Sequence, residues 1–177
     1  MESATRITPD YDAFPTAHGP VLITDTEDKQ IISLDANTGS VNWRLTMSTG
    51  IGSEESIAAT PQTGVPTHQV VVSPNGRYLA IRTHSYLAPE DSENIGDQRV
   101  GITVLDAETG ETVRTVEVPG LVLGQALTND SLAVEIAQNY YPAGTGVVTV
   151  FSLSDAQAEP TSFRSDQWLI GASPESL

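Results

Sequence analysis

The sequence predicts an all-β fold built from about three repeats of four antiparallel strands. Short segments of alternating apolar and β-branched residues recur along the chain, and residues typical of turns separate them. One turn sequence occurs twice, each time between two such segments. No stretch of about a dozen residues shows the 3.6-residue apolar period of an amphipathic helix.

The predicted strands are closely spaced, and each ends where turn residues begin. In chain order they are Val21–Ile23, Gln30–Asp35, Val41–Leu45, Val70–Val72, Tyr78–Ile81, Gly101–Asp106, Thr112–Val116, Val122–Leu127, Ser131–Ile136 and Val148–Leu153. The turn at 128–130 is predicted to join two of these strands into a hairpin, as the turn at 73–76 does one repeat earlier.

The repeated turn has the pattern Asp-Ala-x-Thr-Gly. It begins at Asp35 and again at Asp106. An Asp side chain accepts hydrogen bonds from backbone N–H groups two or three residues further on. Gly39 and Gly110 supply the positive φ that a tight turn with a bulge requires. Both carboxylates are therefore assigned a structural role and not a catalytic one.

These copies define a repeat of four strands. A degenerate third copy, 148–155, lacks the turn glycine. Four strands over about 40 to 50 residues is the period of a propeller blade. The predicted units are a first blade at about 6–47, a loop at 48–67, a second blade at about 67–120 with a loop at 84–99, a third blade at about 121–164, and the start of a further blade at 165–177.

Two segments resemble known propeller repeats. Ser33, Asp35, Gly39 and Trp43 fall on the pattern A-x-D-x-x-x-G-x-x-x-W of pyrroloquinoline-quinone-like propellers, with serine in place of the alanine. The segment 73–80 resembles the S-P-D-G-x-x-L-A stretch of WD40-like propellers. The resemblance implies antiparallel four-stranded blades. Arg114 replaces the tryptophan in the second copy, so a tryptophan contact between blades is expected only once.

About three blades make an incomplete ring, because closed propellers typically have about four to eight blades. Two alternatives follow from this count. Either the chain belongs to a longer array, or its open ends pair with a partner. Unpaired sheet edges readily associate with other strands, so self-association through the open edges is predicted.

Composition excludes several functions. The chain has 23 acidic and 8 basic residues and a formal net charge of −15. Nucleic-acid binding depends on Lys and Arg neutralising phosphates, so nucleic acid and direct binding to an anionic membrane are predicted to be absent. The lack of cysteine excludes disulfides, thiolate metal sites and Cys nucleophiles. His18, His68 and His84 stand alone, so no catalytic or cofactor-binding residue is predicted.

Two loops carry the candidate binding residues. Asp91, Glu93 and Asp97 offer oxygen ligands suited to Ca²⁺, although their spacing is not that of an EF-hand, and a solvated acidic loop is the preferred interpretation. Tyr86, Tyr140 and Tyr141 lie between equivalent strands of adjacent repeats, so they are predicted to emerge on one rim as a contact patch. Packing at the strand ends is the alternative explanation for these tyrosines.

The function predicted from these features is a non-enzymatic binding or scaffold module. It would present loops on a propeller rim to a protein or glycan, outside the cytoplasm, the location being what the resembling families imply. One alternative is part of a quinoprotein-type dehydrogenase propeller. Another is a purely structural repeat of a larger surface protein.

Overall fold

The computed structural model describes residues 11–24, 30–47, 70–85, 99–119, 121–137 and 146–165. All regular structure in these ranges is β-strand. The strands are β1 (Tyr11–Phe14), β2 (Val21–Thr24), β3 (Gln30–Leu34), β4 (Val41–Thr46), β5 (Val70–Val72), β6 (Tyr78–Ser85), β7 (Arg99–Asp106), β8 (Thr112–Pro119), β9 (Leu121–Leu127), β10 (Ser131–Ala137), β11 (Gly146–Ser152) and β12 (Thr161–Ser165). The described residues form no helix of the length and apolar character needed to cross a membrane.

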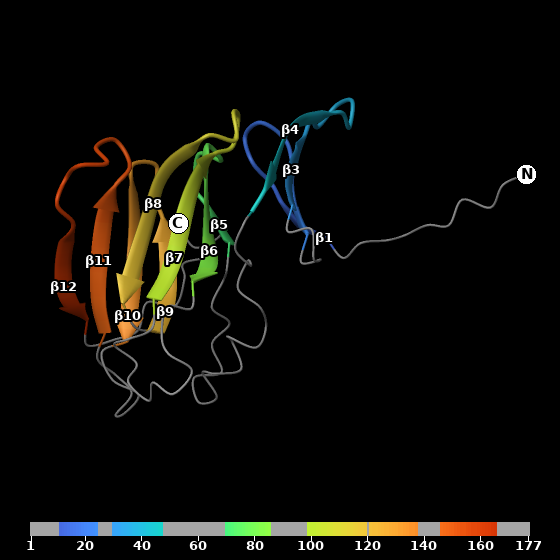
Figure 1. Cartoon of the computed structure of the whole chain (residues 1–177). Coiled ribbons are helices and arrows are strands. Elements are labelled where there is room, and N and C mark those ends of the chain that lie inside the picture. Colours follow the sequence, from blue (N-terminus) through green and yellow to red (C-terminus); the bar gives the residue numbers. More distant parts are fainter. Residues whose placement is uncertain are drawn as a thin grey trace, which may run out of the picture.

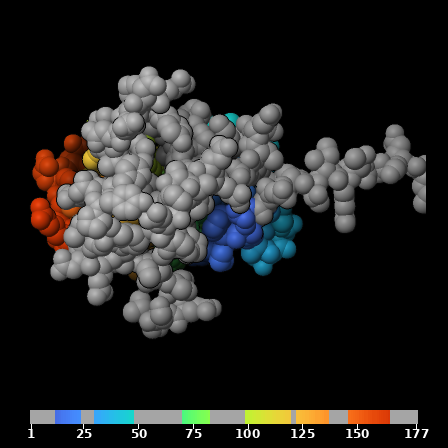
Figure 2. Space-filling model, turned by 90° about the horizontal axis from the view of Figure 1, so that it is seen from below, coloured from blue at the N-terminus to red at the C-terminus, as the bar shows by residue number. Residues whose placement is uncertain are grey.

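The strands form three antiparallel sheets of four, and neighbours in each sheet are neighbours in the sequence. We call them blade 1 (β1–β4), blade 2 (β5–β8) and blade 3 (β9–β12). Blade 2 stands between the other two, with β12 at one end of the row and blade 1 at the other (Figure 1). The view from below also shows blade 1 in blue and blade 3 in red on opposite sides of the molecule (Figure 2). The predicted all-β fold of four-stranded, propeller-type blades in an open arrangement is therefore confirmed.

The repeated turns have the predicted geometry. Oδ1 of Asp35 accepts hydrogen bonds from the backbone N–H groups of Asn37 (3.0 Å) and Thr38 (2.8 Å). Oδ1 of Asp106 accepts from the residues two and three further on, at 3.0 and 3.3 Å. Gly39 and Gly110 have φ values of 69° and 75°. Both aspartates thus act as turn residues.

The hydrogen bonds at Asp35 also affect its ionisation. The backbone N–H and the hydroxyl of Thr38, followed by the backbone N–H of Asn37, stabilise the carboxylate and lower the pKa of Asp35 below its ordinary value. The turn is therefore tightest when this carboxyl group is ionised.

Blade 2 is covered on both faces. Leu79, Ile81 and Leu105 pack against blade 1, whereas Ala80, Ile102 and Val104 pack against blade 3. Residues 79–82 of β6 are consequently all buried. This explains why the strand reads as a continuous apolar run, since alternation is expected only where one face meets water.

The structure corrects the alignment of the third repeat. Val150 pairs with Thr161 as Val104 pairs with Arg114, which places Ser152, and not Asp155, at the position of Asp106. Its hydroxyl accepts a hydrogen bond from the backbone N–H of Asp155 at 3.2 Å. Serine therefore takes the place of the first aspartate, and Oδ1 of Asp155 accepts from the backbone N–H of Gln157 at 2.9 Å further along the same turn.

Two strands were not predicted from the sequence, namely β1 and β12. Both are outer members of their sheets. Their sequences, YDAF and TSFRS, are short and do not show clear alternation of apolar and polar residues. These segments become strands because they pair with a neighbouring strand, and not because their own residues strongly favour the strand conformation. Residues 166–177, predicted to begin a further blade, lie outside the described residues.

Candidate interaction surface

At one end of the three blades, the described connections are turns of three to eight residues. Here the first strand of each blade turns into the second, and the third into the fourth, and we call this end the turn rim. The turns are 15–20 and 35–40 in blade 1, 73–77 and 107–111 in blade 2, and 128–130 and 153–160 in blade 3. The backbone N–H of Ala17 donates to the carbonyl of Gly76 (3.0 Å) and that of Asn75 donates to Oδ1 of Asn129 (3.1 Å), so adjacent blades are linked along this rim.

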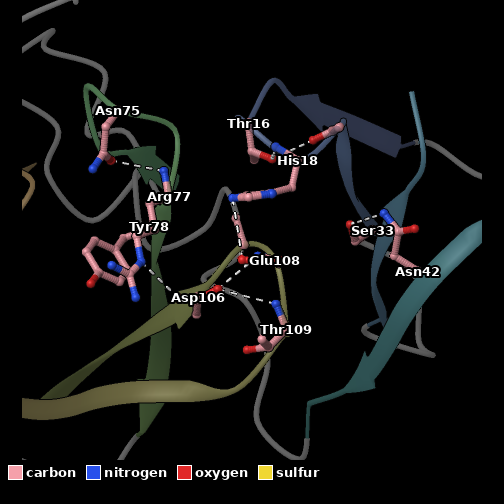
Figure 3. Close-up of polar contacts among 12 residues, drawn as sticks. Thr16, His18, Ser33, Asn42, Asn75, Arg77, Tyr78, Asp106, Glu108 and Thr109 are labelled. Atoms are coloured by element: carbon pink, nitrogen blue, oxygen red, sulfur yellow. Dashed lines mark hydrogen bonds and ion pairs between the residues drawn. The ribbon is translucent and has the colours of Figure 1, made fainter. Parts of the chain in front are cut away.

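Polar side chains on the turn rim mostly stabilise the turns themselves. Oδ1 of Asn75 accepts from the Ser73 hydroxyl (2.7 Å) and from the backbone N–H of Arg77 (3.0 Å). The Arg77 side chain reaches Oδ2 of Asp106 at 3.2 Å. These contacts occupy the same corner of blade 2 (Figure 3). These side chains therefore help to fix the backbone of the rim.

His18 lies on this rim, in the turn between β1 and β2. Its Nε2 is 3.9 Å from Oε2 of Glu108, which belongs to the next blade, and both side chains are well exposed (Figure 3). An exposed pair of this kind contributes little to stability. His84 lies in β6 and His68 lies outside the described residues, so the three histidines are not brought together by anything that the structure describes.

The seam between blades 1 and 2 is anchored by Trp43. Its indole Nε1–H donates to the carbonyl of Ala107 at 3.0 Å, in the turn between β7 and β8. The ring lies over Gly110, where a Cβ atom would approach Cδ2 of the indole to 2.7 Å. The glycine of this turn is thus required twice, for its positive φ and for the close approach of the tryptophan.

The seam between blades 2 and 3 is anchored by Arg114, at the equivalent position of blade 2. Its guanidinium donates to the carbonyl of Asp155 at 2.9 Å and to that of Ser152 at 2.5 Å. It also lies 5.5 Å from the centroid of the Phe151 ring. The tryptophan contact therefore occurs in one of the two seams, as expected, and arginine makes the corresponding contact in the other.

Three buried polar side chains were not identified from the sequence. Arg82, Gln125 and Glu135 are at most 5% exposed. A guanidinium nitrogen of Arg82 donates to the carbonyl of Val122 across the second seam at 3.3 Å. Burial lowers the pKa of Arg82, because desolvation penalises the charged form. The apolar surroundings in sequence, LAIRT and LAVEI, gave no sign that these side chains would be enclosed.

The strand ends opposite the turn rim carry the predicted binding loops. Connections 86–98 and 138–145 each join the second strand of a blade to its third strand. The contact between Arg82 and Val122 shows that blades 2 and 3 lie side by side near this end. The candidate residues themselves, Tyr86, Asp91, Glu93, Asp97, Tyr140 and Tyr141, lie outside the described residues. Over the parts of the chain that are described, no three His, Asp or Glu residues are grouped so as to hold a metal ion.

Comparison with known proteins gives matches among solved structures alone. No protein-family model matches the sequence, and no curated protein matches it. TolB from Acinetobacter baumannii is 16% identical, with a TM-score of 0.46, over 89% of this chain and 33% of TolB. The Neurospora crassa Pan2 WD40 domain is 15% identical, with a TM-score of 0.44, over 83% of this chain and 37% of that domain.

A third match is the quinohemoprotein alcohol dehydrogenase ADHIIG from Pseudomonas putida HK5. It is 11% identical, with a TM-score of 0.45, over 93% of this chain and 31% of the enzyme. The chain spans about a third of the length of these three proteins. Likenesses this distant do not transfer an activity.

Proposed function

We propose that the chain is a non-enzymatic binding or scaffold module whose binding surface lies at the end opposite the turn rim. The observation that carries the proposal is the difference between the two ends of blades 2 and 3. At the turn rim, polar side chains stabilise the turns, and the connections of blade 2, 73–77 and 107–111, are shorter than connection 86–98 at its other end. At the other end, connections 86–98 and 138–145 leave adjacent sheets from equivalent positions. Long loops on a rigid scaffold are where binding residues concentrate.

The rigidity comes from the two seams. Trp43 and Arg114 tie each blade to the next, and twelve buried apolar residues fill the seam between blades 2 and 3. The loops are therefore proposed to meet their partner from a fixed base. This reduces the conformational entropy lost on binding. The proposed partner is a protein or a glycan, with Tyr86, Tyr140 and Tyr141 as contact residues and the location outside the cytoplasm.

The test uses a peptide display library and a printed glycan array, probed with the full chain. A variant with Tyr86→Ser, Tyr140→Ser and Tyr141→Ser is compared with Glu108→Gln, which changes an exposed side chain on the turn rim. The proposal expects specific ligands whose binding falls about tenfold or more in the triple variant and is unchanged in the control. Ligands bound equally by the triple variant would overturn it.

The enzyme alternative has its own measurement. Pyrroloquinoline quinone and Ca²⁺ are added to the chain and binding is followed by absorbance. The proposed function expects no saturable 1:1 complex. A 1:1 complex would instead assign the chain to the quinoprotein class.

A further inference from the structure

The apolar contact between blades 1 and 2 lies close to the turn rim. On the side of blade 2 that faces blade 1, the buried apolar residues are Leu79, Ile81 and Leu105, all in the half of the blade next to the rim. Thr115 and Glu117 of β8 point to the same side and are exposed. The described packing between these two blades therefore covers only part of this side and does not extend over β8.

The contact between blades 2 and 3 runs along the whole of blade 2. Val100, Ile102 and Val104 alternate along β7 and are all buried on the side that faces blade 3. Val116 and Val118 of β8 are buried beside them. Hydrophobic stabilisation grows with the apolar area that is removed from water. Blades 2 and 3 are therefore expected to separate less readily than blades 1 and 2.

The polar contacts described between blades 1 and 2 lie at the turn rim. The indole of Trp43 donates to the carbonyl of Ala107, and the backbone N–H of Ala17 donates to the carbonyl of Gly76, each at 3.0 Å. Both acceptors belong to turns of the rim. These two contacts hold the blades together at one end of the seam.

Blades 2 and 3, in contrast, are also linked at the end opposite the rim, which we call the loop end. Arg82 donates to the carbonyl of Val122 at 3.3 Å there. Gly120 alone separates the last residue of β8 from the first residue of β9, so the chain itself keeps these strands close. Blades 1 and 2 have no such short link, since β4 ends at Thr46 and β5 begins at Val70.

We propose that blade 1 opens away from blade 2 as a unit, pivoting on the contacts of the turn rim, while blades 2 and 3 stay packed together. The sheets separate first toward the loop end, because the described polar contacts hold the rim. The opening uncovers Ile31 of blade 1 and Ile81 of blade 2, both of which are fully buried in the closed structure. Proteins open in contiguous units at free energies below that of complete unfolding. The proposed binding loops belong to blades 2 and 3, so their base stays fixed while blade 1 moves.

The test measures how often each seam opens. The chain has no cysteine, so a single introduced thiol reports its own position. Ile81 and Ile102 are both 0% exposed and lie in neighbouring strands of blade 2, Ile81 facing blade 1 and Ile102 facing blade 3. Ile81→Cys and Ile102→Cys are therefore matched variants. Each is reacted with DTNB without denaturant, and the rate is divided by that of the unfolded chain to give the open fraction.

The open fraction is expected to be at least about tenfold larger for Ile81→Cys than for Ile102→Cys. It should also rise less steeply with urea than complete unfolding does, because opening one seam exposes only part of the buried surface. Ile102→Cys should react only through complete unfolding, which urea titration of the same variant measures. Equal open fractions, or a larger one for Ile102→Cys, would overturn the proposal. If either variant does not fold, Leu105→Cys and Val104→Cys provide a second pair, adjacent in β7 and facing opposite seams.

A second change tests the pivot. Trp43→Phe keeps an aromatic ring near Gly110 but removes the hydrogen bond to Ala107. In the Ile81→Cys background the open fraction is expected to rise about three- to tenfold. In the Ile102→Cys background it should change only as much as complete unfolding does. An equal rise in both would show that Trp43 stabilises the whole fold and not this seam. Because the cysteines report on the seams and not on the loops, the proposal can fail while the proposed binding function stands.

Discussion

The seam between blades 1 and 2 and the seam between blades 2 and 3 are built from one repeat but are anchored differently. Trp43 lies over a turn that contains Gly110 and donates one hydrogen bond to a carbonyl. Arg114 donates to two carbonyls of a turn that has no glycine. The number of buried apolar residues differs too, with six in the first seam and twelve in the second.

The difference shows that the anchoring residue matches the turn that receives it. At a turn with glycine, the missing Cβ atom leaves room for the indole to approach the backbone. The turn of blade 3 exposes the carbonyls of Ser152 and Asp155 instead, and a guanidinium, with several donors in a planar fork, binds two of them at once. The substitution of tryptophan by arginine is thus not a loss of the seam contact.

The largest losses of stability are expected when each anchor is replaced by the residue of the other seam. Trp43→Arg removes the ring contact with Gly110 and leaves the guanidinium a single carbonyl, with an expected cost of about 2 to 4 kcal/mol. Arg114→Trp leaves two carbonyls without their donor and is expected to cost about 1 to 3 kcal/mol. Urea unfolding followed by circular dichroism measures both. Wild-type stability in either variant would mean that the anchors do not depend on their turns.

The two turn glycines are expected to differ in how much stability is lost when each is replaced by alanine. Gly39→Ala and Gly110→Ala introduce the same strain at positive φ, about 1 to 2 kcal/mol, but only Gly110 would meet the indole. Gly110→Ala is therefore expected to cost at least about 1 kcal/mol more than Gly39→Ala. Thermal unfolding of the two variants gives the difference. Equal losses would show that Trp43 moves aside without cost.

The smallest expected effect concerns the pH dependence of the turn in blade 1. Because the pKa of Asp35 is lowered in the folded chain, its contribution is present above the ordinary Asp pKa, about 3.9. The contribution is lost as the pH falls through the lower folded value. Asp35→Asn should therefore flatten the dependence of the unfolding free energy on pH in this acidic range, and the loss of stability relative to wild type should be present at neutral pH and disappear as the pH falls. A curve identical to wild type would contradict the assignment.

Much of the fold could be predicted because the chain repeats its own turns. Asp35, Gly39, Asp106 and Gly110 encode local geometry through short-range hydrogen bonds and backbone sterics, which act within four or five residues. The strands between them are short and apolar, so their existence follows from the spacing of the turns. The outer strands β1 and β12 escaped prediction because their order comes from neighbours in the sheet and not from their own residues.

The candidate binding residues were predicted from loop length and composition, and those predictions stay open, since Tyr86, Tyr140 and Tyr141 lie outside the described residues. The buried side chains of Arg82, Gln125 and Glu135 could not have been found in this way. Each becomes enclosed only when blades or strands far apart in the sequence come together.

The all-β class, the four-strand repeat and the turns between its strands can be predicted from the sequence alone. They depend on interactions between residues that are close along the chain. Only the tertiary structure decided how the blades are joined: that Arg114 replaces Trp43 as an anchor, that Ser152 replaces an aspartate, and that Gly39 remains uncovered. These features depend on which surface faces which across a seam. Local propensity does not encode that choice, since it is made by packing between blades.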